Sequence, residues 1–227
     1  MRGYGQFCPV AKASEILAER WTPLVLRELL CGSRHFNDLR RGVPLMSPSL
    51  LSKRLKELEG AGIIDRLEAD NGQTEYRLTP AGRELRPIIM QLGEWGLRWV
   101  RQRFGNNDLD PAVLMWDLRR RAHPEAFPPG LTVVKFEISD VPAGKRDWWV
   151  LSGPEGVDVC ISDPGFEPSL YVAAPMAMLA RVWLGDCSLT KAVESGNLRL
   201  TGAAQLKRRL RAWLGLSVFA STPRPRV

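Results

Sequence analysis

The sequence predicts an α+β protein of two domains, residues 1–105 and 106–227. Three observations favour this fold class. In the first domain, short helical patterns precede a predicted β-hairpin and a long helix. In the second domain, most predicted strands come before most predicted helices, which is typical of an antiparallel sheet covered by helices. A polar stretch over residues 106–111 separates the two patterns and marks the expected boundary.

Composition permits a nucleic-acid partner without requiring one. The chain has 227 residues, of which 44% are hydrophobic, so each domain can bury a core. Its formal net charge is +7. Residues 1–105 carry 17 Lys and Arg against 12 Asp and Glu, and residues 106–227 carry 15 against 13. The net charges of the two parts are therefore +5 and +2, and the larger excess lies with the first domain.

Several function classes find no support in the residues. The sequence begins without an apolar signal region, and no stretch approaches the roughly 18 apolar residues of a membrane span, so we expect a cytoplasmic protein. The four cysteines form no C-x-x-C pair and the chain has two histidines, which argues against a metal site. No Ser/His/Asp order and no phosphate-binding glycine loop is present. We therefore expect neither an enzyme nor a bound cofactor.

One predicted helix, over residues 47–60, has two chemically different sides. Ser47 suits the N-cap and Pro48 the first helical position. At 100° per residue, three leucines fall on one side of this helix. The other side carries hydroxyls and ammonium groups but no carboxylate, from Ser49, Ser52, Lys53 and Lys56. Such a face fits a polyanion, so this helix is expected to enter a DNA groove.

The elements around this helix predict a helix-turn-helix with a wing. Helices are expected over residues 8–20, 24–30 and 36–41, and strands over 63–68 and 74–79 with an Asp-Asn-Gly turn between them. A long helix should follow from residue 81 to about residue 104. Its apolar face exceeds what so small a core needs, and such a surface favours association. The expected dimerisation residues are Ile88, Leu92, Trp95 and Trp99.

Candidate DNA contacts follow from this arrangement. Arg34, Lys53, Arg54 and Lys56 are expected to neutralise phosphates, although Arg54 lies between the two faces of its helix. The first turns of a recognition helix reach deepest into the groove, which makes Ser47, Ser49, Ser52 and Lys53 the candidates for base edges. Asn71 and Gln73 lie at the predicted tip of the wing.

Residues 4–105 resemble the HxlR-type winged-helix transcription regulators, relatives of the MarR group. The resemblance is carried by SPSLLSKRL at 47–55, YRLTPAG at 76–82, and residues 8–10, 20–22, 26–29, 36–39, 58–59 and 62. It implies a homodimer on a pseudo-palindromic operator, with helix 47–58 in the major groove. In some members a cysteine of the first helix senses oxidants, and Cys8 occupies that place. The alternative for Cys8 is a small buried packing residue.

The second half resembles the sterol-carrier-protein-like domain over residues 125–215. The matching pieces are residues 133–138 and 170–172, WVLSGPEG at 149–156, MLARVWLGD at 178–186 and LTKAVESGNLRLTG at 189–202. The resemblance implies an apolar tunnel that holds a lipid or another hydrophobic molecule. Residues that would line such a tunnel are Trp148, Trp149, Phe166, Met176, Met178, Leu179, Val182, Trp183 and Trp213. The alternative is that these residues fill a closed core.

Taken together, the sequence predicts a regulator that binds double-stranded DNA as a homodimer. Its inputs would be a hydrophobic small molecule in the second domain or oxidation of Cys8. The competing hypothesis is a lipid-carrier protein whose winged helix serves dimerisation or protein contacts.

Overall fold

The computed structural model describes residues 3–69, 72–100 and 108–223. The chain divides into two compact units, Met1–Gly93 and Glu94–Val227. The predicted domain boundary at residues 105 and 106 lies outside the described residues. No helix in the described part of the chain is both long and apolar enough to cross a bilayer.

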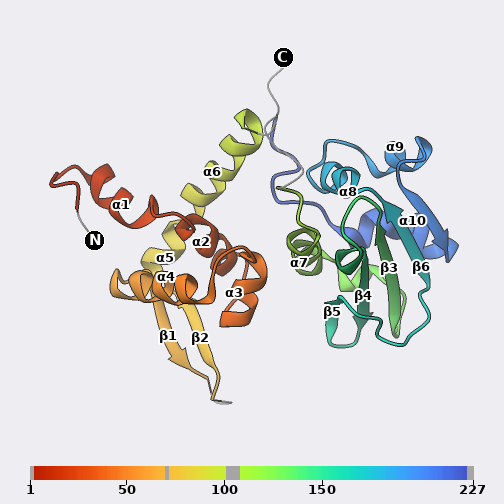
Figure 1. The fold of residues 1–227 in the computed structure, drawn as a ribbon, viewed down its shortest axis with the longest axis horizontal. Helices are drawn as coiled ribbons and strands as arrows, with labels where there is room; N and C mark the ends of the chain where they lie inside the picture. The colour runs from red at the N-terminus through yellow and green to blue at the C-terminus, as the bar shows by residue number, and fades with distance from the viewer. Residues whose placement is uncertain (1–2, 70–71, 101–107, 224–227) are drawn as a thin grey trace. The chain divides into compact units, whose positions relative to one another are not determined.

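The N-terminal unit consists of helices followed by a hairpin (Figure 1). The helices are α1 (Pro9–Leu17), α2 (Thr22–Leu30), α3 (Phe36–Gly42) and α4 (Pro48–Gly60). Strands β1 (Ile64–Glu68) and β2 (Thr74–Leu78) pair antiparallel, with Arg66 opposite Tyr76. The core of this unit is aliphatic and draws on every element from α2 to β1, with Val25, Leu26, Leu39, Leu51, Leu55 and Ile64 almost fully buried. The order of four helices followed by a hairpin is the predicted one.

The expected long helix after the hairpin is interrupted. It forms as α5 (Pro80–Glu84) and α6 (Arg86–Trp99), separated at Leu85. Pro87 explains the break, because it has no N–H for the carbonyl of residue 83 and its ring would collide with that carbonyl in a continuous helix. The expected continuation to residue 104 falls mostly on residues 101–107, outside the described residues.

The C-terminal unit is a five-stranded sheet with helices packed on one face (Figure 1). The strands are β3 (Thr132–Ile138), β4 (Asp147–Gly153), β5 (Gly156–Cys160), β6 (Leu170–Ala174) and β7 (Arg199–Gly202). The helices are α7 (Pro111–Arg121), α8 (Met176–Trp183), α9 (Leu189–Glu194) and α10 (Ala204–Leu214), with short 3₁₀ turns η3 (Pro124–Ala126) and η4 (Ala143–Lys145).

The prediction of an antiparallel sheet is wrong at one pairing. The strand order is β5-β4-β3-β6-β7, and β3 pairs with β6 in parallel while the other three pairings are antiparallel. The sheet is therefore mixed. A parallel pairing needs a long connection, and here β4 and β5 lie between β3 and β6 in the sequence. Strand β3 points every second side chain into the core, namely Val134, Phe136 and Ile138. These side chains pack with the apolar sides of α7, α8 and α10.

Candidate nucleic-acid interface

Helix α4 is fixed at its start and along its inner side. The hydroxyl oxygen of Ser47 accepts a hydrogen bond from the backbone N–H of Leu50 at 3.3 Å, as an N-cap does. The Oγ atoms of Ser47 and Ser49 are 3.2 Å apart. Three leucines anchor the helix to the core, because Leu51, Leu55 and Leu58 are each at most 1% exposed. The predicted inner side of α4 is thus confirmed.

The outer side of α4 presents four polar residues to solvent. Ser49, Ser52, Lys53 and Lys56 are all exposed. The expectation that this face carries no carboxylate needs one correction. Glu57 Oε1 lies 3.9 Å from the ammonium of Lys53, at the edge of the face. The Lys53 side chain is 66% exposed, and exposed pairs of this kind contribute at most about 1 kcal/mol. Lys53 can therefore exchange Glu57 for a phosphate at little cost.

Arg54 differs from the other candidate DNA contacts. It is 8% exposed, and its guanidinium contacts Glu19 Oε2 at 2.6 Å and Glu57 Oε2 at 2.5 Å. The side chain therefore points toward the turn between α1 and α2 and joins that turn to α4. A residue that is buried and paired in this way does not face a DNA backbone. Arg54 is accordingly a structural contact of α4, which corrects its expected role.

The wing is attached to the segment between α2 and α3. The carbonyl of Arg34 accepts a hydrogen bond from the N–H of Tyr76 at 2.8 Å, and His35 Nδ1 lies 3.2 Å from the carbonyl oxygen of Thr74. These contacts place the exposed Arg34 beside strand β2. Gln73 is exposed at the start of that strand, and Asn71 lies outside the described residues.

One carboxylate belongs to this cationic neighbourhood. Arg77 Nε donates to Glu75 Oε2 at 2.7 Å. This hydrogen bond lowers the pKa of the Glu75 carboxyl below its ordinary value of 4.5, although partial burial acts in the opposite direction. The charges of Arg77, His35 and Arg34 also lower this pKa. Glu75 therefore offsets part of the positive charge on the wing.

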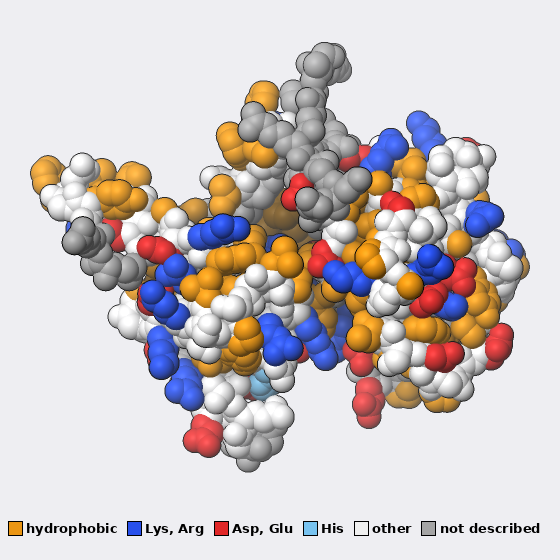
Figure 2. Space-filling model, viewed as in Figure 1, with side chains coloured by type: hydrophobic (Ala, Val, Ile, Leu, Met, Phe, Trp, Pro, Cys, Tyr) orange, Lys and Arg blue, Asp and Glu red, His pale blue; other side chains and the backbone are white. Residues whose placement is uncertain are grey.

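Two further cations of this unit escaped sequence reasoning. Arg40 on α3 and Arg66 on β1 are exposed. Figure 2 shows Lys and Arg side chains gathered on the N-terminal unit near the hairpin and the short helices. The alternation of strand β1 places Arg66 on the same side as the buried Ile64, so the strand pattern carries no signal that Arg66 is exposed. The acidic residues Asp65 and Glu68 lie close to Arg66 in the sequence, so this segment does not stand out as basic.

Cys8 lies at the N-cap position of α1 and is exposed. The alternative of a buried packing residue is therefore wrong for Cys8. The side chain makes no capping hydrogen bond, whereas its carbonyl accepts from the N–H of Lys12 at 3.1 Å. The Lys12 ammonium is engaged with Glu15 Oε1 at 3.0 Å. The lysine of α1 nearest to Cys8 in the sequence is therefore paired with a carboxylate.

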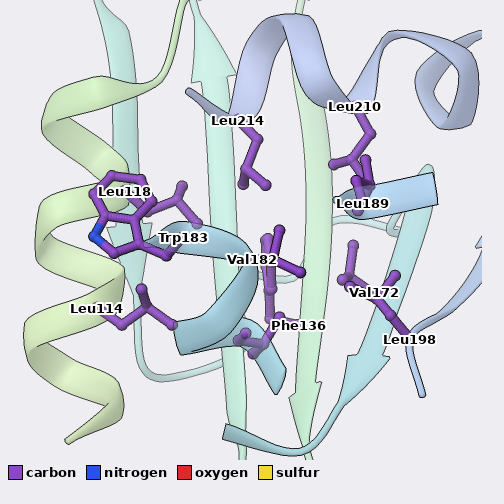
Figure 3. A pocket seen from close by; sticks show the side chains of 11 residues that line it. Leu114, Leu118, Phe136, Val172, Val182, Trp183, Leu189, Leu198, Leu210 and Leu214 are labelled. Carbon is purple, nitrogen blue, oxygen red and sulfur yellow. The ribbon is translucent and has the colours of Figure 1, made fainter. Parts of the chain in front are cut away.

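The core of the C-terminal unit contains a small apolar cavity. The cavity has a volume of about 20 Å³, which is room for one water-sized molecule. Figure 3 shows side chains from α7, α8, α10 and the sheet converging on it. Its lining includes three of the predicted residues, Leu179, Val182 and Trp183, together with Phe136 and Val172.

The other six predicted tunnel residues do not line this cavity. Trp148 and Met178 are buried in the core of the unit, and Trp148 Nε1 donates to the carbonyl of Lys145 at 2.8 Å. Trp149 contacts the ammonium of Lys135, which lies 5.5 Å from its ring centroid. Phe166 is exposed. In this structure the closed-core alternative describes these side chains better than a tunnel does.

Comparison with known proteins concerns the N-terminal unit and α6. Residues 16–104 match a protein family described as HxlR-like helix-turn-helix. The uncharacterized HTH-type transcriptional regulator YvaP of Bacillus subtilis is 37% identical over 98 residues, which cover 42% of this chain and 91% of YvaP. This chain belongs to the HxlR-like helix-turn-helix family. The uncharacterized HTH-type transcriptional regulator Rv3095 of Mycobacterium tuberculosis is 44% identical over 89 residues. These residues cover 38% of this chain and 56% of Rv3095.

Solved structures of similar proteins cover the same part of this HxlR-like chain. The redox regulator HypR in its oxidized form is 34% identical, with a TM-score of 0.37, covering 40% of this chain and 95% of HypR. PA1607, a putative transcription factor, is 27% identical with a TM-score of 0.40, covering 45% of this chain and 70% of that protein. TM-scores of this size support no inference about function.

Proposed function

We propose that this chain is a DNA-binding transcriptional regulator of the HxlR type that binds a pseudo-palindromic site as a homodimer. The observation that carries the proposal is the outer side of α4. Its exposed serines and lysines stand opposite three buried leucines, in a chain that belongs to a helix-turn-helix family. We retain Ser47 with these residues, although its hydroxyl is already used as the N-cap.

In the proposed complex, α4 lies in the major groove. Ser49 and Ser52 contact base edges, and Lys53 and Lys56 contact bases or flanking phosphates. Arg34 and the wing residue Gln73 reach the neighbouring backbone, with Asn71 assigned from the sequence alone. Phosphate contacts dominate affinity and make it fall with salt, whereas base contacts set the sequence preference.

The proposed dimer uses one side of α6. Ile88, Leu92, Trp95 and Trp99 are 50–60% exposed and recur at spacings of four, three and four residues, so they form one stripe along the helix. Such a stripe is the pattern of helices that pack against each other. Two copies joined in this way present two α4 helices to two half-sites.

Two inputs are proposed for regulation. The exposure of Cys8 makes its thiol accessible to oxidants, so that loss of the oxidant response in Cys8→Ser would support a sensing role. A hydrophobic effector in the C-terminal unit, residues 106–227 in the predicted division, would have to expand a cavity of about 20 Å³. It would act only by binding the two DNA-binding conformers with different affinity. The same small cavity disfavours the lipid-carrier alternative.

The test is a mobility-shift experiment on the DNA upstream of the gene, repeated at several salt concentrations. Lys53→Ala with Lys56→Ala should reduce the slope of log affinity against log salt by roughly 0.9 for each phosphate that is no longer neutralised. Ser52→Ala should change the sequence preference by about 1–3 kcal/mol at the base it contacts. Lys12→Ala is the matched control, because this exposed lysine of α1 is paired with Glu15. An affinity that is independent of sequence, or unaffected by the α4 variants, would contradict the proposal.

A further inference from the structure

The net charge of the chain is concentrated in its last 33 residues. Residues 195–227 contain seven Lys and Arg residues and no Asp or Glu, while the remaining residues contain 25 of each charge. The whole formal charge of +7 therefore lies in this segment. Residues 106–194 contain eight basic and 13 acidic residues, so the modest +2 of the second domain conceals a strong separation of charge.

Helix α10 carries most of these cations in the described residues. Its inner side is apolar, since Leu206, Leu210 and Trp213 are buried in the core of the unit. Winding the helix at 100° per residue places Arg208 and Arg211 opposite this inner side, and Lys207 and Arg209 on its two flanks. We call the surface formed by Lys207, Arg208, Arg209 and Arg211 the α10 basic face. The helix contains no acidic residue.

The α10 basic face differs from the paired cations on α7 and on the η4 turn of the same unit. Arg119 pairs with Asp158 at 2.8 Å, and Lys145 pairs with Asp110 at 3.3 Å. Among the described residues, no hydrogen bond or ion pair engages the side chains of the α10 basic face. Glu125, on the η3 turn that packs against α10, contacts His123 at 3.2 Å.

This arrangement does not serve the stability of the helix. Like charges four residues apart, as at Lys207 and Arg211, destabilise a helix, and Arg208 and Arg211 are also neighbours at a spacing of three. The helix dipole accounts for a cation in the last turn, which is Arg211. It does not account for Lys207, Arg208 and Arg209 in the middle of the helix. No ion pair in the described part of the unit offsets this repulsion, and a bound polyanion would relieve it.

We propose that the α10 basic face binds the phosphate backbone of double-stranded nucleic acid, as a second contact surface separate from α4. Along its outward side, Arg208 and Arg211 are flanked by Ala204 and Ala212, whose short side chains allow a phosphate backbone to approach closely. An anionic membrane fits less well. Helices that lie in a bilayer surface insert apolar side chains, and those of α10 are buried in the protein core.

The test measures affinity of the full chain for a random-sequence DNA duplex over a range of KCl concentrations. Arg208→Gln combined with Arg211→Gln should lower the slope of log affinity against log salt by roughly 1.8, which corresponds to two neutralised phosphates. Arg119→Gln combined with Lys145→Gln removes the same charge from paired positions of the same unit, and should leave the slope nearly unchanged. Circular dichroism and thermal unfolding establish that both variants are folded.

The outcomes separate this inference from the proposed function. If the α10 variant and its control give the same slope while Lys53→Ala with Lys56→Ala lowers it, the α10 basic face is not a DNA contact and the regulator proposal stands. If the α10 variant lowers the slope and the α4 variant does not, the α10 basic face is a DNA contact and the proposed role of α4 is contradicted. Phosphatidylserine vesicles form a second arm, because vesicle binding that disappears in the α10 variant with DNA binding unchanged would overturn the nucleic-acid assignment in favour of a lipid surface.

Discussion

The carboxylate of Glu28 occupies the space that a β-carbon on residue 42 would fill. Gly42 at the end of α3 is buried, and Glu28 on α2 is fully buried beside it. Arg27 holds the pair together, because its guanidinium contacts Glu28 Oε1 at 2.7 Å and donates to the carbonyl of Gly42 at 3.0 Å. The packing of α2 on α3, which supports α4, thus depends on the absence of a side chain at one position.

Gly42→Ala is therefore expected to destabilise the N-terminal unit. The added methyl group must displace a buried carboxylate from its partners, and overpacking of this kind costs about 1–3 kcal/mol. Urea unfolding measures the effect. Gly60→Ala is the matched control, because no atom lies within 4 Å of a β-carbon there. Equal free energies of unfolding for the two variants would show that α2 and α3 have room to move apart.

Arg54→Ala should reduce stability and leave the salt slope of DNA binding unchanged. The variant removes the link between α4 and the turn that joins α1 to α2, at a cost of about 1–3 kcal/mol, since the Glu19 and Glu57 carboxylates are partly exposed and regain water. Lys56→Ala should do the opposite, with a stability change within about 0.5 kcal/mol and a smaller salt slope. A reduced slope in Arg54→Ala at full stability would restore Arg54 as a phosphate contact.

Leu92→Glu combined with Trp95→Glu should convert the proposed dimer to a monomer. Each large apolar side chain buried in an interface contributes about 1.5–3 kcal/mol, and the variant also places charges in the contact. Sedimentation velocity at micromolar concentration measures the change. Gln91→Glu adds a charge to α6 beside the stripe and serves as the control. A wild-type chain that is monomeric at every concentration would contradict the dimer.

Leu118→Ala should enlarge the cavity in the C-terminal unit. Leu118 is buried and lines the cavity, so its truncation costs about 2–5 kcal/mol. The enlarged apolar space should bind xenon or benzene, which crystals exposed to either ligand would reveal. Leu131→Ala is the control, because Leu131 is exposed. Retention of a lipid by the wild-type chain, measured by mass spectrometry of extracts, would show instead that this core opens in solution.

Arg77→Gln should raise the pKa of Glu75 toward 4.5, because the variant removes the guanidinium that favours its carboxylate. A carboxyl whose pKa is lowered by folding stabilises the folded state fully above pH 4.5, and this contribution disappears as the pH falls through the folded pKa. NMR titration of the side-chain carboxyl measures the shift. Arg66→Gln, on the neighbouring strand, should change the pKa of Glu75 less, and an equal effect would assign the shift to general charge.

Sequence reasoning succeeded where the deciding contacts are local. The cap at Ser47, the buried leucines of α4 and the hairpin all follow from residues a few positions apart, and the structure confirms them. Exposure of the α6 stripe was likewise expected from the size of its apolar face.

It failed where partners are distant in sequence. Arg54 pairs with Glu19, 35 residues away, and nothing in the pattern of α4 indicates that an arginine between its faces should turn inward. The parallel pairing of β3 with β6 also depends on tertiary packing. The size of the cavity is a third case, because the volume enclosed by apolar residues depends on how closely α7, α8 and α10 approach the sheet.

Pro87 has a consequence for operator spacing. By separating α5 from α6, it sets the direction of the α6 axis relative to the rest of the winged helix. In the proposed dimer, α6 joins the two copies, so the bend at residues 85–87 contributes to the distance between the two α4 helices and hence between the two half-sites. Relatives with a different residue at this bend would then prefer operators of different length while reading the same bases.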